Sequence, residues 1–205
     1  MYRGKILNYK NDKSGMLVLI RLEDTAAPVK KRQDVTLYLD EDREITGQQR
    51  KKIYATLNDI AIFTGYSPVE AKQIMKYEHI KRTGCDYFSL SDCSIDTARE
   101  FINTLVEFCL HNGVPVKEPM LSRTDDIDTY LYQCLRHRKC CICGRDGEVH
   151  HWDTVGMGND RRTYDDRFNR KMCLCRVHHT IAHQKGVADF QEKYHVYGII
   201  YNESE

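Results

Sequence analysis

The last third of this 205-residue chain carries more metal-binding side chains than a single site can use. Between positions 140 and 183 there are five cysteines and five histidines. Such a cluster constrains the fold, because thiolates and imidazoles that share an ion must lie within a few ångströms of one another. We therefore expect two metal sites in one small fold, one closed and structural, the other open and catalytic.

Two short motifs predict the closed site. Cys140 and Cys143 form a C-x-x-C pair, and Cys175 and His178 form a C-x-x-H pair. Together they make a Cys₃His set, which suits tetrahedral structural zinc. A redox C-x-x-C would need a thioredoxin-like strand–helix–strand context, which the sequence lacks.

The other thiols are expected to be reduced. The start of the chain lacks the apolar segment of a signal peptide, and no stretch reaches the ~18 apolar residues of a membrane span. A cytoplasmic protein with free or metal-bound cysteines is therefore expected. Cys141 and Cys173 are spare, and either could replace a neighbour as zinc ligand. Cys109 lies on the apolar face of a predicted helix, as a packed thiol.

Four further residues are not needed for zinc: His150, His151, Asn169 and His179. Adjacent residues on a helix diverge by ~100°, so His178 can face the zinc while His179 faces elsewhere. His183 lies four residues after His179, on the same helix face. On a short strand, His150 and His151 would point to opposite sides, so one can bind a metal while the other acts as a base. The alternative is a zinc-finger scaffold with surface histidines.

The fold class predicted for the whole chain is α+β, with strands first and helices after. Strands are expected near residues 6–7, 16–22 and 35–39, with a turn at 11–15. Capping boxes at Thr46-x-x-Gln49 and Ser67-Pro68-x-Glu70 predict two helix starts. The second helix should bury a stripe formed by Ala71, Ile74 and Met75.

Two more helices are expected beyond these. One runs from about Ser94 to a stop at Asn112-Gly113. The other begins at Thr124 and carries three aspartates in its first turn, at positions 125, 126 and 128. Pro115 and Pro119 mark residues 114–122 as a linker. We therefore predict a first domain at 1–120 (β-rich 1–40, helical 45–113) and a second at 121–205.

The two metal motifs and the residues between them resemble an HNH endonuclease. The resemblance implies a ββα-metal fold, a hairpin followed by a helix, with a zinc knuckle. It assigns His151 as general base, Asn169 as the residue that fixes the loop and orients the base, and His179 as a metal ligand. His150 occupies a ligand position that many members fill with Asp. With His179 it would hold the catalytic ion, which could be Mg²⁺, Mn²⁺, Ni²⁺ or Zn²⁺. His183 has no firm counterpart in the family and is expected to be a further ligand of this ion or a phosphate contact.

This chemistry suits phosphodiester hydrolysis. A neutral histidine, with an ordinary pKa of ~6.5, can deprotonate water. A cation then stabilises the charge on the phosphate and the leaving oxygen. Overall charge does not argue for nucleic acid, since 31 Lys+Arg face 30 Asp+Glu. Candidate DNA contacts are the basic residues Arg161, Arg162, Arg170, Lys51 and Lys52. The alternative is a solvated surface charge, which is the more frequent role of lysines such as Lys51 and Lys52.

A second resemblance covers the middle of the chain. Residues 45–60 and the predicted helix that follows Phe88–Ser91 resemble the phage Orf (NinB) recombination proteins. The C-terminal run through His178-His179 and the tail at 194–198 resemble HNH nucleases of phages. The resemblance implies a homodimer that binds single-stranded or tailed DNA alongside single-strand-binding protein and recombinase. Its location would be the host cytoplasm.

Three functions follow from these patterns. The first is a phage recombination protein with an active HNH nuclease. The second is a non-catalytic recombination mediator, whose C-terminal module is a zinc-stabilised DNA-binding element. The third is a transcription regulator of zinc-ribbon type, which leaves Asn169 and His179 without a role.

Overall fold

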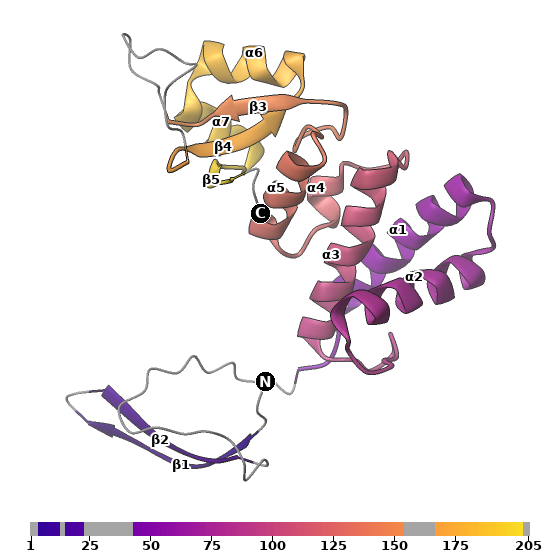
Figure 1. Ribbon diagram of the computed structural model, residues 1–205, viewed down its shortest axis with the longest axis vertical. Coiled ribbons are helices and arrows are strands. Elements are labelled where there is room, and N and C mark those ends of the chain that lie inside the picture. The colour runs from indigo at the N-terminus through magenta and orange to yellow at the C-terminus, as the bar shows by residue number, and fades with distance from the viewer. Residues whose placement is uncertain (1–3, 13–14, 23–42, 154–166, 203–205) are drawn as a thin grey trace. The chain divides into compact units, whose positions relative to one another are not determined.

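The computed structural model describes residues 4–12, 15–22, 43–153 and 167–202. Within these ranges the chain forms small antiparallel sheets and seven helices (Figure 1), which confirms the α+β class. The chain divides into two compact units, Met1–Asp40 and Glu41–Glu205. Over the same described ranges, no helix is both long and apolar enough to cross a membrane.

The first unit contains a β-hairpin. Its strands β1 (Gly4–Asp12) and β2 (Gly15–Leu22) pair antiparallel from Gly4 opposite Leu22 to Asp12 opposite Gly15. The register shifts between Ile6 and Asn8, as at a β-bulge. The strands expected near 6–7 and 16–22 are confirmed, whereas the centre of the turn expected at 11–15 lies outside the described residues. The strand expected at 35–39 lies outside the described residues.

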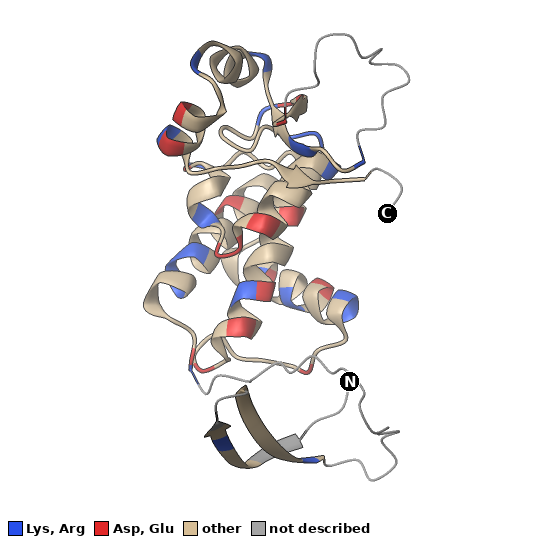
Figure 2. Ribbon diagram, turned by 90° about the vertical axis from the view of Figure 1, so that its left-hand side faces the viewer, with Lys and Arg blue, Asp and Glu red and all other residues tan. Residues whose placement is uncertain are grey.

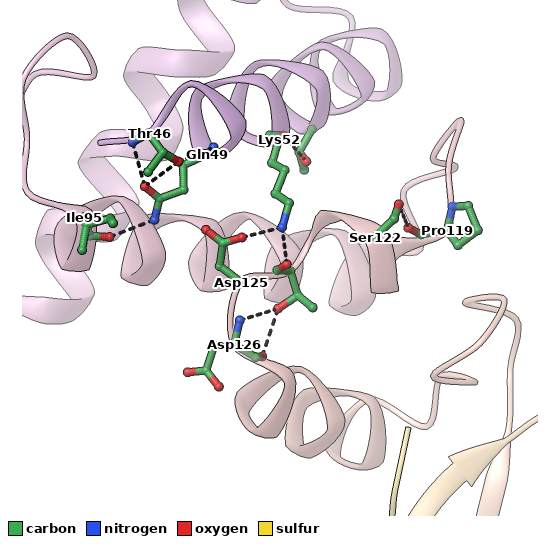
Figure 3. A network of polar contacts seen from close by, with 10 residues as sticks. Thr46, Gln49, Lys52, Ile95, Pro119, Ser122, Asp125 and Asp126 are labelled. Atoms are coloured by element: carbon green, nitrogen blue, oxygen red, sulfur yellow. Dashed lines mark hydrogen bonds and ion pairs between the residues drawn. The ribbon is translucent and has the colours of Figure 1, made fainter. Parts of the chain in front are cut away.

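The second unit begins with three helices that start and end where local signals place them. These are α1 (Gly47–Thr64), α2 (Pro68–Thr83) and α3 (Ile95–Asn112). At α1 the Thr46 hydroxyl accepts from the Gln49 amide at 3.1 Å, while the Thr46 amide donates to the Gln49 side chain at 3.0 Å (Figure 3). Ser67 and Glu70 form the same capping box at α2. Both predicted boxes are confirmed, as is the helix ending at Gly113.

The helical core lies between these three helices. Ile53, Leu57 and Phe101 are almost completely buried, and so is Cys109, as expected. Burial raises the pKa of the Cys109 thiol to about 12, which agrees with a packed, unreactive side chain. The stripe predicted for α2 is wrong at Ile74, whose side chain is exposed, because Lys76 and His79 occupy the inner face together with Ala71 and Met75.

The expected linker at 114–122 is not a linker. Val114 is buried, and the short helix α4 (Met120–Arg123) begins with the buried Met120. Arg123 donates from Nη2 to the Asp59 carboxylate at 3.3 Å, and both side chains are almost fully buried. This segment is therefore packed into the second unit, because Val114 and Met120 are buried and Arg123, which directly follows it, bonds to Asp59 of α1. The functional division at residue 120 stays a prediction.

The next helix, α5 (Ile127–Arg136), begins three residues later than predicted. Asp126 is its N-cap and accepts from the Thr129 amide at 3.1 Å, so only Asp128 of the three aspartates lies in the first turn. Asp125 precedes the helix and forms an ion pair with Lys52 of α1 (Figure 3). The sequence predicts that Asp125 interacts with the dipole of this helix, but its carboxylate is paired with Lys52 of α1 instead.

The rest of the unit contains the expected hairpin and helix. In chain order its elements are β3 (Glu148–His151), β4 (Arg170–Leu174), α6 (Arg176–Lys185), α7 (Val187–Tyr194) and β5 (Ile199–Ile200). The strands form one antiparallel sheet in the order β3-β4-β5. On α5, the buried Tyr130 donates its hydroxyl to the carbonyl of Cys141 at 2.8 Å. A buried hydrogen bond thus joins α5 to the turn that carries Cys140 and Cys143.

Candidate metal centre and active site

The Cys₃His cluster forms where the turn after α5 meets the start of α6. Cys140 and Cys143 lie on the turn, Cys175 is the N-cap of α6, and His178 lies in its first turn. One ligand atom from each of the four residues lies within 4.8 Å of the others. The turn is closed by the Gly144 amide, which donates to the Cys140 carbonyl at 2.8 Å. The structure thus brings together the complete predicted set.

The distances within this cluster are those of a tetrahedral zinc site. Zinc bonds of about 2.3 Å to sulfur and about 2.0 Å to nitrogen place sulfurs about 3.8 Å apart and sulfur and nitrogen about 3.5 Å apart. The Sγ atoms of Cys143 and Cys175 are 3.7 Å apart, and His178 Nδ1 lies 3.3 Å from Cys175 Sγ and 3.4 Å from Cys140 Sγ. The cluster is therefore compatible with structural zinc.

The neighbouring thiols belong to the core. Cys141 and Cys173 are fully buried, and the Cys141 amide donates to the Cys173 carbonyl at 3.0 Å. Burial raises the pKa of the Cys173 thiol to about 12 and also raises that of Cys141. Neither belongs to the four-residue cluster, so the geometry favours Cys140 and Cys175 over their neighbours as ligands.

Three histidines form a second cluster on the other side of α6. His150 comes from β3, while His179 and His183 lie one turn apart on α6. The ring centroids are 4.7 Å (His150–His179), 4.9 Å (His150–His183) and 4.8 Å (His179–His183) apart. His179 Nε2 and His183 Nε2 are 3.1 Å apart, close to the roughly 3.3 Å between two nitrogens on a tetrahedral ion. As predicted from helix geometry, His178 and His179 serve different clusters.

Protonation of His150 is disfavoured within this group. His150 is only 4% exposed. Its burial, together with the nearby His179 and His183, lowers its pKa to about 4. A neutral imidazole is the form that binds metal ions. The buried member of the triad is thus already in its ligand form at neutral pH.

Glu148 is a polar neighbour of the triad that sequence reasoning missed. Its Oε1 lies 2.5 Å from His179 Nδ1, on the side of the ring away from His183. The signal that could have found it is the alternation of β3, since Glu148 and His150 are two residues apart and share a strand face. The sequence alone could not show that His179 on α6 lies next to this face of β3.

The remaining two residues of the expected HNH set lie at the ends of the hairpin strands. His151 is the exposed last residue of β3, on the face opposite to the buried His150, as predicted. Asn169 is half-buried and directly precedes β4. Both side chains lie near the end of the sheet where the Trp152 amide donates to the Arg170 carbonyl at 2.8 Å.

The expected DNA contacts have mixed surroundings. Lys51 is exposed, whereas Lys52 donates to the Thr124 carbonyl at 2.6 Å and pairs with Asp125. Arg170 donates from Nη2 to the Asp153 carboxylate at 2.6 Å. The last two predicted contacts, Arg161 and Arg162, lie outside the described residues.

Charge is distributed without a dominant sign on the helices of the second unit. Figure 2 shows acidic and basic positions interspersed along them. The charges of the helices therefore give no electrostatic reason to choose one helix face for DNA.

A β-hairpin followed by a helix, with a histidine at a strand end and further histidines on the helix, is the arrangement expected of an HNH-type nuclease module. The sequence agrees with that class, because the family described as "Putative HNHc nuclease" matches residues 22–204. The chain belongs to this family, which indicates nuclease activity on DNA with a divalent metal. Among curated proteins and solved structures, none matches the chain.

Proposed function

We propose that this chain is a metal-dependent HNH endonuclease that hydrolyses phosphodiester bonds in DNA. The observation that carries the proposal is the convergence of His150, His179 and His183 from a strand and a helix onto one point. The same strand presents His151 on its opposite, exposed face. A base and a cation site held by adjacent residues can act on one phosphate from different directions.

Each residue has a defined task in this reaction. His151 accepts the proton of the attacking water as its oxygen bonds to phosphorus and the bond to the 3′-oxygen breaks. Asn169, just before β4, fixes the neighbouring loop and so orients the base. The three histidines, which lie on two packed elements, would hold a divalent cation in a fixed position. Such an ion would supply positive charge for the phosphate and the leaving oxygen.

The donor set favours particular ions. The described cluster consists of three imidazoles, and imidazole suits Zn²⁺, Ni²⁺ and Cu²⁺, whereas Mg²⁺ prefers carboxylate and water oxygens. Of the four ions that the sequence leaves open, Ni²⁺ and Zn²⁺ fit the cluster best, followed by Mn²⁺. We therefore expect activity with Mg²⁺ to be the weakest.

Plasmid nicking tests this function directly. Purified full-length protein is assayed with Ni²⁺, Zn²⁺, Mn²⁺ and Mg²⁺ in turn, and His151→Ala is compared with His111→Ala. His111 is an exposed histidine of α3, so its replacement controls for loss of an imidazole. Activity should fall by 100-fold or more only in His151→Ala, since general bases contribute roughly 100- to 10,000-fold. Equal activity of the two variants with every ion would refute the assignment.

We further propose that the enzyme acts in phage DNA recombination, as a homodimer that binds single-stranded or tailed DNA with single-strand-binding protein and recombinase. In support, three tyrosines on and between α1 and α2 are exposed: Tyr54, Tyr66 and Tyr77. Exposed aromatic rings can stack on unpaired bases. Fluorescence anisotropy with a single-stranded oligonucleotide should show weaker binding by Tyr77→Ala, while light scattering of the free protein gives the oligomeric state.

The non-catalytic mediator remains the competing function, and the same measurements separate the two. A mediator would bind single strands as tightly after His151→Ala as before, and the wild-type protein would nick with none of the four ions. The full chain is needed for these assays. Because Arg123 pairs with the buried Asp59 and Gln133 donates to the Asn103 carbonyl at 3.1 Å, residues 41–205 form one unit, and a fragment ending at 120 would expose core surface.

A further inference from the structure

The start of strand β3 brings a carboxylate next to the histidine triad. Glu148 pairs with Leu174 in the antiparallel ladder, one residue before Cys175 caps α6. Because side chains alternate along a strand, Glu148 and His150 project from the same face of β3. The His179 ring lies 4.7 Å from the His150 ring, and its Nδ1 is 2.5 Å from Glu148 Oε1. One strand face thus contacts His179 at two points.

The contact determines which nitrogen of His179 carries its proton. An ionised carboxylate can only accept a hydrogen bond, so His179 Nδ1 must be the donor. In a neutral imidazole the other nitrogen, Nε2, then keeps a free lone pair. This lone pair faces His183 Nε2 at 3.1 Å, at the point shared by the three histidines.

We propose that Glu148 is a positioning residue that holds His179 in the Nδ1–H tautomer and presents its Nε2 to the ion. The inference rests on the proposed function, since the ion is the one that function requires. Metal-bound histidines commonly donate their second N–H to a carboxylate, which fixes the ring and makes the imidazole more basic. Glu148 acts through His179, because among the residues that the structure describes the group of converging ligand atoms consists of the three histidines and does not include Glu148.

The exposure of Glu148 sets the size of the expected effect. Its side chain is 63% exposed and that of His179 is 25% exposed, so water can take over part of the contact. Outer-shell partners of metal-bound histidines are worth about 10- to 100-fold in metal affinity. An exposed partner belongs at the lower end, and we expect about tenfold. Exposure also means that replacing Glu148 should leave the fold intact.

Two measurements on the full-length protein with its structural zinc in place test the proposal. Calorimetry gives the dissociation constant of Ni²⁺ for wild type, Glu148→Ala and Glu148→Gln. Glu192→Ala removes an exposed carboxylate of α7 and serves as the matched control. Long-range ¹⁵N–¹H spectra recorded before Ni²⁺ is added report the His179 tautomer, with the signal assigned by its absence in His179→Gln.

The expected pattern is specific to a positioning role. Wild type should show His179 protonated at Nδ1, and Glu148→Ala should show a mixture of tautomers and about tenfold weaker Ni²⁺ binding. Glutamine keeps an oxygen that can accept from Nδ1, so Glu148→Gln should restore the tautomer and part of the affinity. Glu192→Ala should match wild type in both measurements.

Other results would overturn the proposal in distinguishable ways. Protonation of wild-type His179 at Nε2, or an unchanged tautomer and affinity in Glu148→Ala, would remove the positioning role. Complete loss of Ni²⁺ binding in both Glu148 variants would make Glu148 a direct ligand instead. If wild type bound no Ni²⁺ beyond its zinc, the proposed nuclease site would fail, while the tautomer spectra would still decide the role of Glu148.

Discussion

Two metal clusters share one helix, and their differences suit them to different tasks. His178 and His179 are neighbours on α6, yet one faces three cysteines and the other faces two histidines. The cysteine cluster offers thiolates that neutralise the charge of a bound ion. The histidine cluster offers neutral imidazoles, which leave the charge of the ion available to a phosphate.

The surroundings of the two clusters strengthen this contrast. Cys140 and Cys175 are buried, and the Arg145 guanidinium donates to Cys143 Sγ at 3.4 Å. Of the histidines, His150 is buried while His183 is exposed. Four ligands complete a tetrahedral shell, whereas three leave positions open for substrate. The same helix can therefore serve a closed structural ion and an open catalytic ion.

Loss of a zinc ligand should have the largest effect. Cys140→Ala removes one thiolate of the closed cluster, and structural zinc contributes about 10–16 kcal/mol to folding in small domains. We expect the variant to bind no zinc, and we expect the part of the chain around the cysteine cluster no longer to unfold in one cooperative transition. Metal content by mass spectrometry and thermal unfolding measure both. Cys141→Ala is the matched control, a fully buried neighbour outside the cluster. If Cys141→Ala lost its zinc and Cys140→Ala kept it, Cys141 rather than Cys140 would be the ligand.

The open cluster should respond differently to the loss of a ligand. His183→Ala is expected to weaken Ni²⁺ binding roughly 1000-fold, since even outer-shell partners are worth 10- to 100-fold. Zinc content and the unfolding temperature should stay the same, because His183 is exposed and belongs only to the second cluster. Calorimetry on zinc-loaded protein measures the change. Loss of zinc from this variant would show that the two clusters are not independent.

Sequence alone predicted the parts of this comparison that depend on local geometry. The divergence of His178 and His179 follows from helical periodicity, and the opposite directions of His150 and His151 follow from strand alternation. The capping box at Thr46 is likewise contained in four residues.

Features that depend on long-range packing could not be predicted in this way. Glu148 reaches His179 only because β3 lies beside α6, 31 positions along the chain. The ion pairs Lys52–Asp125 and Arg170–Asp153 also join segments that are distant in the sequence. The charges of Lys52 and Arg170 are therefore paired within the protein. Neither partner is marked by any local pattern.

A buried histidine that belongs to neither metal cluster predicts how acid destabilises the packing of the helices. Burial, with nearby Arg82, lowers the pKa of His79 from 6.5 to about 4, and its Nδ1 lies 2.7 Å from Thr104 Oγ1. Its stabilising contribution is complete above pH 6.5 and is lost as the pH falls toward 4, because the unfolded chain binds the proton first. The loss is roughly 3 kcal/mol, at 1.36 kcal/mol for each pKa unit.

Urea unfolding at several pH values between 7 and 4.5 measures this effect. His79→Gln removes the titrating group, so its stability should fall less steeply with acid than that of wild type. His111→Gln, at an exposed histidine of α3, should keep the wild-type slope. Because the metal ligands are the same in all three proteins, acid release of metal cancels in the comparison. Identical slopes for His79→Gln and wild type would exclude His79 as the source.

The smallest effect is expected at the end of the sheet beside His151. A Cβ on Gly198 would lie 2.4 Å from Trp152 Cβ and 3.0 Å from Arg170 Cβ, so Gly198→Ala must displace one of these packed residues. Such overpacking costs roughly 1–3 kcal/mol. Trp152 is the single tryptophan of the chain, so its fluorescence reports unfolding at this site. Gly47→Ala is the control, because a Cβ there meets no atom within 4 Å.

This last variant also separates the base from the ion. Trp152 follows His151 directly, whereas the three histidines of the open cluster lie on the other face of β3 and on α6. Displacing Trp152 should therefore lower nicking while Ni²⁺ affinity and zinc content stay at wild-type values. Reduced Ni²⁺ affinity in Gly198→Ala would mean that the packing of Trp152 also holds the triad in place. In that case the open cluster would depend on the rigidity of the whole sheet.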